Sequence, residues 1–394
     1  MSKSNQSASA ELPVYLDNAA STPMDERVAA AMIEVISGDC QFGNSASKTH
    51  KFGWIAAEII EKARDQIAQS VGCSPLEIIF TSGATESNNL AIKGISYAQY
   101  RINDSRRHIV TTSIEHKSVL ECCEQLEHHG FKVTYIKPRT DGTVSAQMVA
   151  QAISEDTFLV SIGHANSVLG SINDIESIAK LCREHNIAFH SDCAQTNGLI
   201  DLKLDDGNVS MATLTPEKIY GPKGIGALYI KKAHNIELDP IIVGGGHEKG
   251  LRGGTLATHQ IAGMGAAFEI MKNERDEVFQ KLVKMHDDLL PELKASADIT
   301  INGYNEEGTT PHLPHIISIT FNGAAGRNIV SKFSKIACST GSACSSSQML
   351  PNYVLTEIGL SDDAALSTLR FSLGRFTTNK DLSRAIAEVA RICS

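Results

Sequence analysis

Short apolar runs rich in β-branched residues alternate with helix-forming segments through the middle of the chain. The strand-like runs cover residues 76–81, 108–112, 131–136, 158–162, 186–190 and 209–214. Helical segments begin near residue 82 and cover about 117–129 and 174–185. Strands that alternate with helices in this way predict an α/β fold, with a mostly parallel sheet flanked by helices. Ligands of such folds bind where the strands end.

The pattern changes after about residue 270. A long charged helix is predicted over roughly 271–293, followed by strands over 315–321 and 367–373 and by a terminal helix. A chain of 394 residues also exceeds the size of a single hydrophobic core. We therefore expect a large α/β domain over residues 28–270. Residues 1–27 and 271–394 are expected to form a smaller α+β domain.

Composition excludes several classes of protein. The formal net charge of −9 argues against direct binding to nucleic acid, and no apolar stretch approaches the length of a membrane span. Nine cysteines, scattered and without a CxxC pair, favour a reducing compartment over disulfides or a metal site. Residues 1–10 are small and polar and read as a frayed tail, so we expect a cytoplasmic protein.

Lys218 and Asp192 carry the strongest chemical signal. Asp192 follows the strand at 186–190, and Lys218 follows the next strand at 209–214. A lysine is most often a solvated surface charge, but this spacing suits pyridoxal 5'-phosphate. In that interpretation Lys218 holds the aldehyde as a Schiff base, Asp192 pairs with the protonated ring nitrogen, and Gln195 contacts the ring hydroxyl or the imine. Lys223 competes with Lys218, and Gln195 could instead complete a helix cap.

A phosphate site is predicted where residues 82–87 open a helix. The free N–H groups near Ala84 and the Thr85 hydroxyl suit an anion, although the same residues also fit a plain capping box. Thr215 and Thr255 are further phosphate candidates. His116 ends a strand and is either a surface residue or a ring that stacks on the cofactor and moves protons.

The segment at about 337–348 consists of small residues, so we expect a mobile loop that carries Cys344. A cysteine is usually a buried apolar residue, but Cys344 in such a loop suits a nucleophilic thiol, with Cys338 as the competing candidate. Arg370 lies in an apolar strand and needs a partner, for which a substrate carboxylate would serve; Arg375 is a weaker alternative.

Together these motifs resemble the cysteine desulfurases of the class V aminotransferase group, which are pyridoxal-phosphate enzymes of fold type I. The matching segments run nearly end to end, over residues 15–23, 42–47, 80–89, 115–120, 218–226, 244–247, 254–255, 341–344 and 370–377. The length of the loop around Cys344 resembles the iron–sulfur-assembly subgroup.

The resemblance implies an L-cysteine desulfurase that yields L-alanine and a persulfide on Cys344 for an acceptor protein. It assigns catalysis to Lys218, Cys344 and His116, and the substrate to Arg370 and Asn166. The cofactor contacts are then Ala84, Thr85, His116, Asp192, Gln195, Thr215, Lys218 and Thr255. It also implies a homodimer in which Thr255 reaches the partner's cofactor.

Two positions depart from the family pattern. Glu217 stands where the family usually has a histidine, and Ser167-Val168 stand where it tends to have Asn-Glu. A carboxylate near a phosphate is repulsive, so Glu217 must turn away or pair with a cation. These departures suggest a divergent branch, such as the desulfurases of DNA phosphorothioation. Iron–sulfur assembly, tRNA thiolation, another pyridoxal-phosphate lyase or transaminase, and a non-catalytic binding protein remain alternatives.

Overall fold

The computed structural model describes residues 12–305, 307–323, 329–341 and 350–393. The strands are β1 (Val14–Tyr15), β2 (Ile78–Thr81), β3 (His108–Thr112), β4 (Lys132–Ile136), β5 (Thr157–Ser161), β6 (Ala188–Asp192), β7 (Met211–Leu214), β8 (Gly226–Ile230), β9 (Ile299–Asn302), β10 (Ile316–Phe321), β11 (Ile336–Ala337) and β12 (Thr368–Ser372). The α-helices are α1 (Glu26–Ser37), α2 (Lys51–Val71), α3 (Ala84–Arg101), α4 (Lys117–Glu127), α5 (Ala146–Ala152), α6 (Ile175–Glu184), α7 (Thr258–Ser296), α8 (Ile329–Lys332), α9 (Tyr353–Glu357), α10 (Asp362–Leu366) and α11 (Asn379–Cys393). Short 3-10 helices are η1 (Pro75–Glu77), η2 (Leu204–Asp206), η3 (Lys232–His234) and η4 (Glu248–Gly250).

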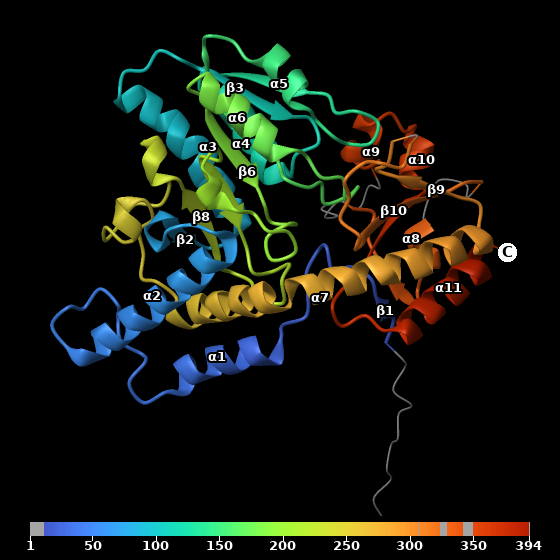
Figure 1. Cartoon of the computed structure of the whole chain (residues 1–394), viewed down its shortest axis with the longest axis horizontal. Coiled ribbons are helices and arrows are strands. Elements are labelled where there is room, and N and C mark those ends of the chain that lie inside the picture. The colour runs from blue at the N-terminus through green and yellow to red at the C-terminus, as the bar shows by residue number, and fades with distance from the viewer. Residues whose placement is uncertain (1–11, 306, 324–328, 342–349, 394) are drawn as a thin grey trace, which may run out of the picture.

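A seven-stranded sheet forms the centre of the fold, in the order β2-β8-β7-β6-β5-β3-β4 (Figure 1). The neighbours from β7 to β4 pair in parallel, whereas β8 runs antiparallel to both β2 and β7. The predicted mostly parallel α/β fold is therefore confirmed. The sequence pattern did not predict β8, because its first residue closes a glycine-rich stretch that is typical of a turn.

Helices cover both faces of this sheet, and the strands are apolar on both sides. Alternate strand residues point to opposite faces. In β3, for example, Val110 packs into the cluster that contains α2 and α7, and Ile109 packs into the cluster that contains α3 and α4. Burial on both faces explains why these strands read as continuous apolar runs instead of alternating ones.

Helix α7 joins the central sheet to a second, three-stranded antiparallel sheet in the order β12-β10-β9 (Figure 1). Its 39 residues span about 58 Å at 1.5 Å per residue. The prediction that this helix begins near Met271 is wrong, because it begins at Thr258. Its first part carries few charges and packs closely on α1 and α2, with Gly263 against Met32 and Gly265 against Ala63.

The expected boundary between residues 270 and 271 lies inside α7, and the division into two domains stays a prediction. The predicted tail at residues 1–10 lies outside the described residues, as does Cys344 with residues 342–349 of its loop. In the described part of the chain, no helix is both long and apolar enough to cross a membrane.

Candidate active site

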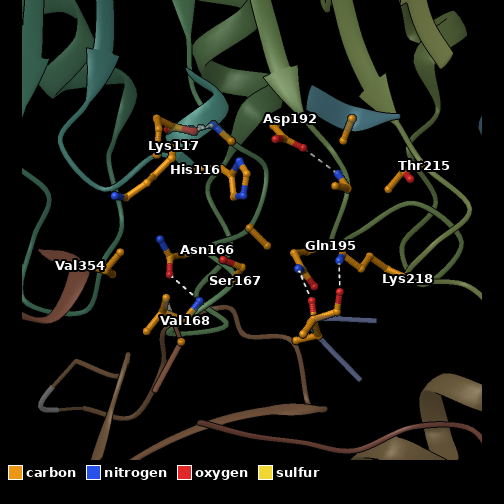
Figure 2. A pocket seen from close by; sticks show the side chains of 18 of the residues that line it. His116, Lys117, Asn166, Ser167, Val168, Asp192, Gln195, Thr215, Lys218 and Val354 are labelled. Atoms are coloured by element: carbon orange, nitrogen blue, oxygen red, sulfur yellow. Dashed lines mark hydrogen bonds between the residues drawn. The ribbon is translucent and has the colours of Figure 1, made fainter. Parts of the chain in front are cut away.

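A cavity of about 900 Å³ lies at the carboxyl ends of the parallel strands, against the second sheet. This volume is typical of a cofactor or small-molecule site. Most of the site residues expected from the sequence line it: Ala84, Thr85, His116, Asn166, Asp192, Gln195, Thr215, Lys218 and Arg370. Arg370 lies within β12, and the others follow or end β2, β3, β5, β6 and β7, so the fold brings together residues that are far apart in the chain. Figure 2 shows several of their side chains around one space.

Lys218 follows β7 in a tightly held turn. The backbone of Thr215, three residues earlier, is held by the Asn197 side chain. Its N–H donates to Asn197 Oδ1 at 2.9 Å, and its carbonyl accepts from Asn197 Nδ2 at 3.0 Å. The Lys218 ammonium donates to the carbonyl oxygen of Ala20. Burial lowers the pKa of Lys218 below its ordinary value of 10.5, and the Glu217 charge opposes this effect. The pocket therefore favours the neutral, nucleophilic amine more than water does.

Asp192 ends β6 with its carboxylate fixed on both oxygens. Oδ1 accepts from the Ala194 N–H at 2.9 Å, and Oδ2 accepts from Asn88 Nδ2 at 2.8 Å. The Asn88 amide also donates to Ser118 Oγ at 2.8 Å, and Ser118 Oγ contacts His116 Nδ1 at 2.8 Å. A hydrogen-bonded chain, whose middle residues Asn88 and Ser118 are buried, therefore joins the carboxylate to the imidazole.

Asn88 was not among the candidate residues, although it falls within a matched motif. It lies one turn after Ala84 on α3, so it shares a helix face with the residues that open the cavity. That spacing was the signal that could have identified it. Its Oδ1 is buried and has no hydrogen-bond partner among the described residues.

His116 caps α4, and its ring projects into the cavity (Figure 2). Nδ1 accepts from the Ser118 N–H at 3.2 Å, so a neutral ring carries its proton on Nε2. The preceding residue, Glu115, is buried and accepts from Thr112 Oγ1 at 2.9 Å and from the Gly163 N–H at 3.0 Å. Burial raises the pKa of Glu115 to about 7, against these hydrogen bonds and with a small addition from the Asp192 charge.

The N-terminus of α3 is open towards the cavity. Its N-cap is Gly83, which has φ 148° and provides no side-chain cap, so the first N–H groups of this 18-residue helix stay available to an anion. The start of β8 crosses close by: a Cβ on Gly226 would lie 2.7 Å from the Gly83 backbone. Glycine at 226 is therefore required for this turn to approach the strand.

Arg370 enters the cavity from β12 and is already paired. Nη2 donates to Asp17 Oδ1 at 2.6 Å, and Nη1 donates to the Ser167 carbonyl at 2.8 Å. Its Nε is buried and has no hydrogen-bond partner in the described part of the chain. A substrate carboxylate on Arg370 would therefore share or displace Asp17.

Asn166 mainly holds the turn after β5. Its Oδ1 accepts from the N–H groups of Val168 and Leu169 at 2.9 and 3.0 Å, and its Nδ2 donates to Ile114 at 3.1 Å. These contacts leave one amide hydrogen for a ligand.

Glu217 lies on the cavity wall with its carboxylate 3.6 Å from Lys218 Nζ, so the expected pairing with a cation is present. Thr255 is exposed and does not line this cavity. Cys338 does line it, and burial raises the pKa of its thiol to about 12. No cluster of described residues has the makeup of a metal site.

The family model described as "Aminotransferase class-V" matches residues 14–385. The chain belongs to this family. Its members depend on pyridoxal phosphate, and the resemblance predicted from the sequence motifs is confirmed.

Among curated relatives, "Cysteine desulfurase IscS" from Stutzerimonas stutzeri is 44% identical over 379 residues, 96% of this chain and 92% of the relative. A solved "NifS-like protein" is 33% identical, with a TM-score of 0.85 over 97% of this chain and 99% of that one. "SspA in complex with cysteine" is 39% identical, with a TM-score of 0.81 over 92% of this chain and 99% of that one.

Proposed function

We propose that this protein is a pyridoxal-phosphate-dependent L-cysteine desulfurase. The observation that carries the proposal is the cavity itself. A largely buried lysine, a fixed carboxylate and an open helix N-terminus line one space, and each of them matches one group of this cofactor. The relatives named cysteine desulfurase support the choice of substrate.

The residues fit the cofactor group by group. Lys218 supplies the amine for its aldehyde, and Asp192 supplies the anion for its ring nitrogen. Gln195 supplies a polar contact for its hydroxyl: Oε1 is buried without a hydrogen-bond partner in the described part of the chain, while Nε2 donates to the Ala19 carbonyl at 3.0 Å. The N–H groups of α3, with Thr85 and Thr215, would hold the phosphate.

When bound, the cofactor supplies a positively charged ring that accepts the electrons of the substrate Cα–H bond. Lys218 would take the Cα proton as a neutral amine, a form that burial favours. Asp192, held by Asn88, keeps the ring nitrogen charged. Arg370 binds the substrate carboxylate, aided by the remaining Asn166 hydrogen.

Cys344 as a thiolate would then attack the substrate sulfur and form a sulfur–sulfur bond as the carbon–sulfur bond breaks. The electron pair of the broken bond stays on the carbon skeleton, which takes up protons to become alanine. His116, with a proton on Nε2, exchanges protons within the cavity. The raised pKa of the Cys338 thiol argues against Cys338 as the nucleophile. The proposal further includes a persulfide that passes to an acceptor protein, a cytoplasmic location, and a homodimer to which Thr255 contributes.

The direct test is alanine formation from L-cysteine by the purified, cofactor-loaded protein. We expect turnover in the wild type and in Lys223→Ala, a matched variant of an exposed lysine in the same segment, and none in Lys218→Ala or Cys344→Ala. Alanine formation that survives Cys344→Ala would instead favour another lyase. A wild type that binds the cofactor but releases no alanine would refute the proposal.

A further inference from the structure

The pair formed by Glu217 and Lys218 is built into the backbone of the turn. The Glu217 carbonyl accepts from the Thr22 N–H at 3.2 Å and from Thr22 Oγ1 at 2.8 Å. The two charged groups lie 3.6 Å apart, with 32% of the Glu217 side chain and 18% of the Lys218 side chain exposed. The Thr22 contacts fix the Glu217 main chain, and from there its carboxylate lies beside the Lys218 ammonium.

Several charges act on Lys218 from different elements. Burial destabilises its ammonium most, and Arg370 on β12 adds to this effect. Glu217 is the strongest opposing group, and Asp192 on β6 opposes more weakly. Tyr15 lies near enough to interact with the charges of Arg370 and Glu217. Burial raises the pKa of its hydroxyl, so Tyr15 stays neutral near neutral pH. Among the charged groups, Glu217 is thus the one that most favours the protonated form of Lys218.

We propose that Glu217 is a positioning residue that pairs with the free Lys218 ammonium and sets how readily it gives up its proton. In this chain a carboxylate at position 217 serves the lysine and not the phosphate. The inference rests on the proposed function, which makes Lys218 the amine that bonds to the cofactor. Removal of the carboxylate would then release the neutral amine at lower pH.

The test is the pH dependence of Lys218 acetylation by acetic anhydride, read by mass spectrometry. It uses the full-length chain freed of cofactor, with its circular dichroism matched to that of the loaded protein. In Glu217→Gln we expect the midpoint to fall by about one pH unit, the size of one charge pair at this distance in a water-like medium. Lys223, exposed in the same segment, is the internal reference, and its acetylation midpoint should be the same in both proteins. Glu184→Gln on α6 is the charge control, and it should leave the Lys218 midpoint unchanged.

A second measurement follows cofactor uptake by the same cofactor-free chain near neutral pH, through the visible absorbance of the bound cofactor. Uptake should be up to about tenfold faster in Glu217→Gln. A fall of one pH unit in the Lys218 midpoint raises the fraction of neutral Lys218 amine about tenfold. An unchanged Lys218 midpoint would overturn the inference even if the enzyme is active. Absence of desulfurase activity with a shifted midpoint would instead overturn only the proposed function.

If Glu217→Gln does not fold, the wild type still provides a test. A partly exposed ion pair is screened by salt, so 1 M KCl should lower the Lys218 midpoint towards that of an unpaired buried lysine. A midpoint that does not respond to salt would contradict the pairing.

Discussion

Replacement of Glu115 by glutamine should make the protein more stable at high pH and leave its stability almost unchanged at low pH. The Glu115 carboxyl is buried, and burial raises its pKa to about 7, against an ordinary value of 4.5. A folded state that raises the pKa of a carboxyl binds its proton more tightly than the unfolded chain does. Stability from this group is therefore complete below about pH 4.5 and is lost as the pH rises through 7.

A difference of this size corresponds to about 3 kcal/mol at pH 8. Glutamine resembles the protonated carboxyl, so Glu115→Gln avoids that loss. The oxygen of the glutamine amide can still accept from Thr112 and Gly163. Its NH2 group, however, would replace the second carboxylate oxygen and face the Gly163 N–H, so two donors would meet and the gain in stability would be smaller. We expect a net advantage of about 1–3 kcal/mol at pH 8 and close to none at pH 5.

The assay is urea unfolding of both proteins at pH 5 and pH 8, under matched cofactor conditions. Glu121→Gln, an exposed position on α4, is the matched control and should show the same stability difference from wild type at both pH values. A difference between Glu115→Gln and wild type that stays constant or shrinks as the pH rises would refute the reasoning.

Three further predictions concern the framework of the cavity. Glu248→Ala should cost about 3–5 kcal/mol in urea unfolding, because it leaves the buried Arg64 guanidinium without its two-point partner; adding Arg64→Met should recover most of the loss. Asn88→Ala should weaken cofactor binding about tenfold in a titration, since Asp192 loses a hydrogen bond, and unchanged affinity would contradict this role. Gly226→Ala should weaken cofactor binding by at least about tenfold, because its Cβ pushes the turn before α3; wild-type affinity would show that the turn can yield.

The sequence predicted the main features of the sheet because its strands are buried on both faces. A strand such as β3 then consists of an unbroken apolar run, and the residue that follows it lies at the edge where ligands bind. His116, Asp192 and Lys218 could therefore be placed in one site without knowledge of the strand order. Strand β8 and the first part of α7 were missed because glycine there permits close packing, while in a sequence it is typical of turns.

Side-chain pairing across distant segments was the least predictable feature of the site. Arg370 needed a partner, but nothing in the chain indicated that Asp17 takes this place before any substrate does. Asn166 likewise has the chemistry of a substrate ligand, whereas the local backbone uses most of its hydrogen-bonding groups. Such choices depend on which groups the fold brings within about 3 Å of each other, a distance that sequence patterns do not resolve.

The most direct test of the central claim is the fate of the sulfur. Cofactor-loaded protein is incubated with L-cysteine, and the peptide that carries Cys344 is weighed by mass spectrometry. We predict a gain of one sulfur atom in the wild type and in Lys223→Ala, and no gain in Lys218→Ala. A sulfur gain that does not require Lys218, or a wild-type peptide that gains none while alanine accumulates, would contradict this claim.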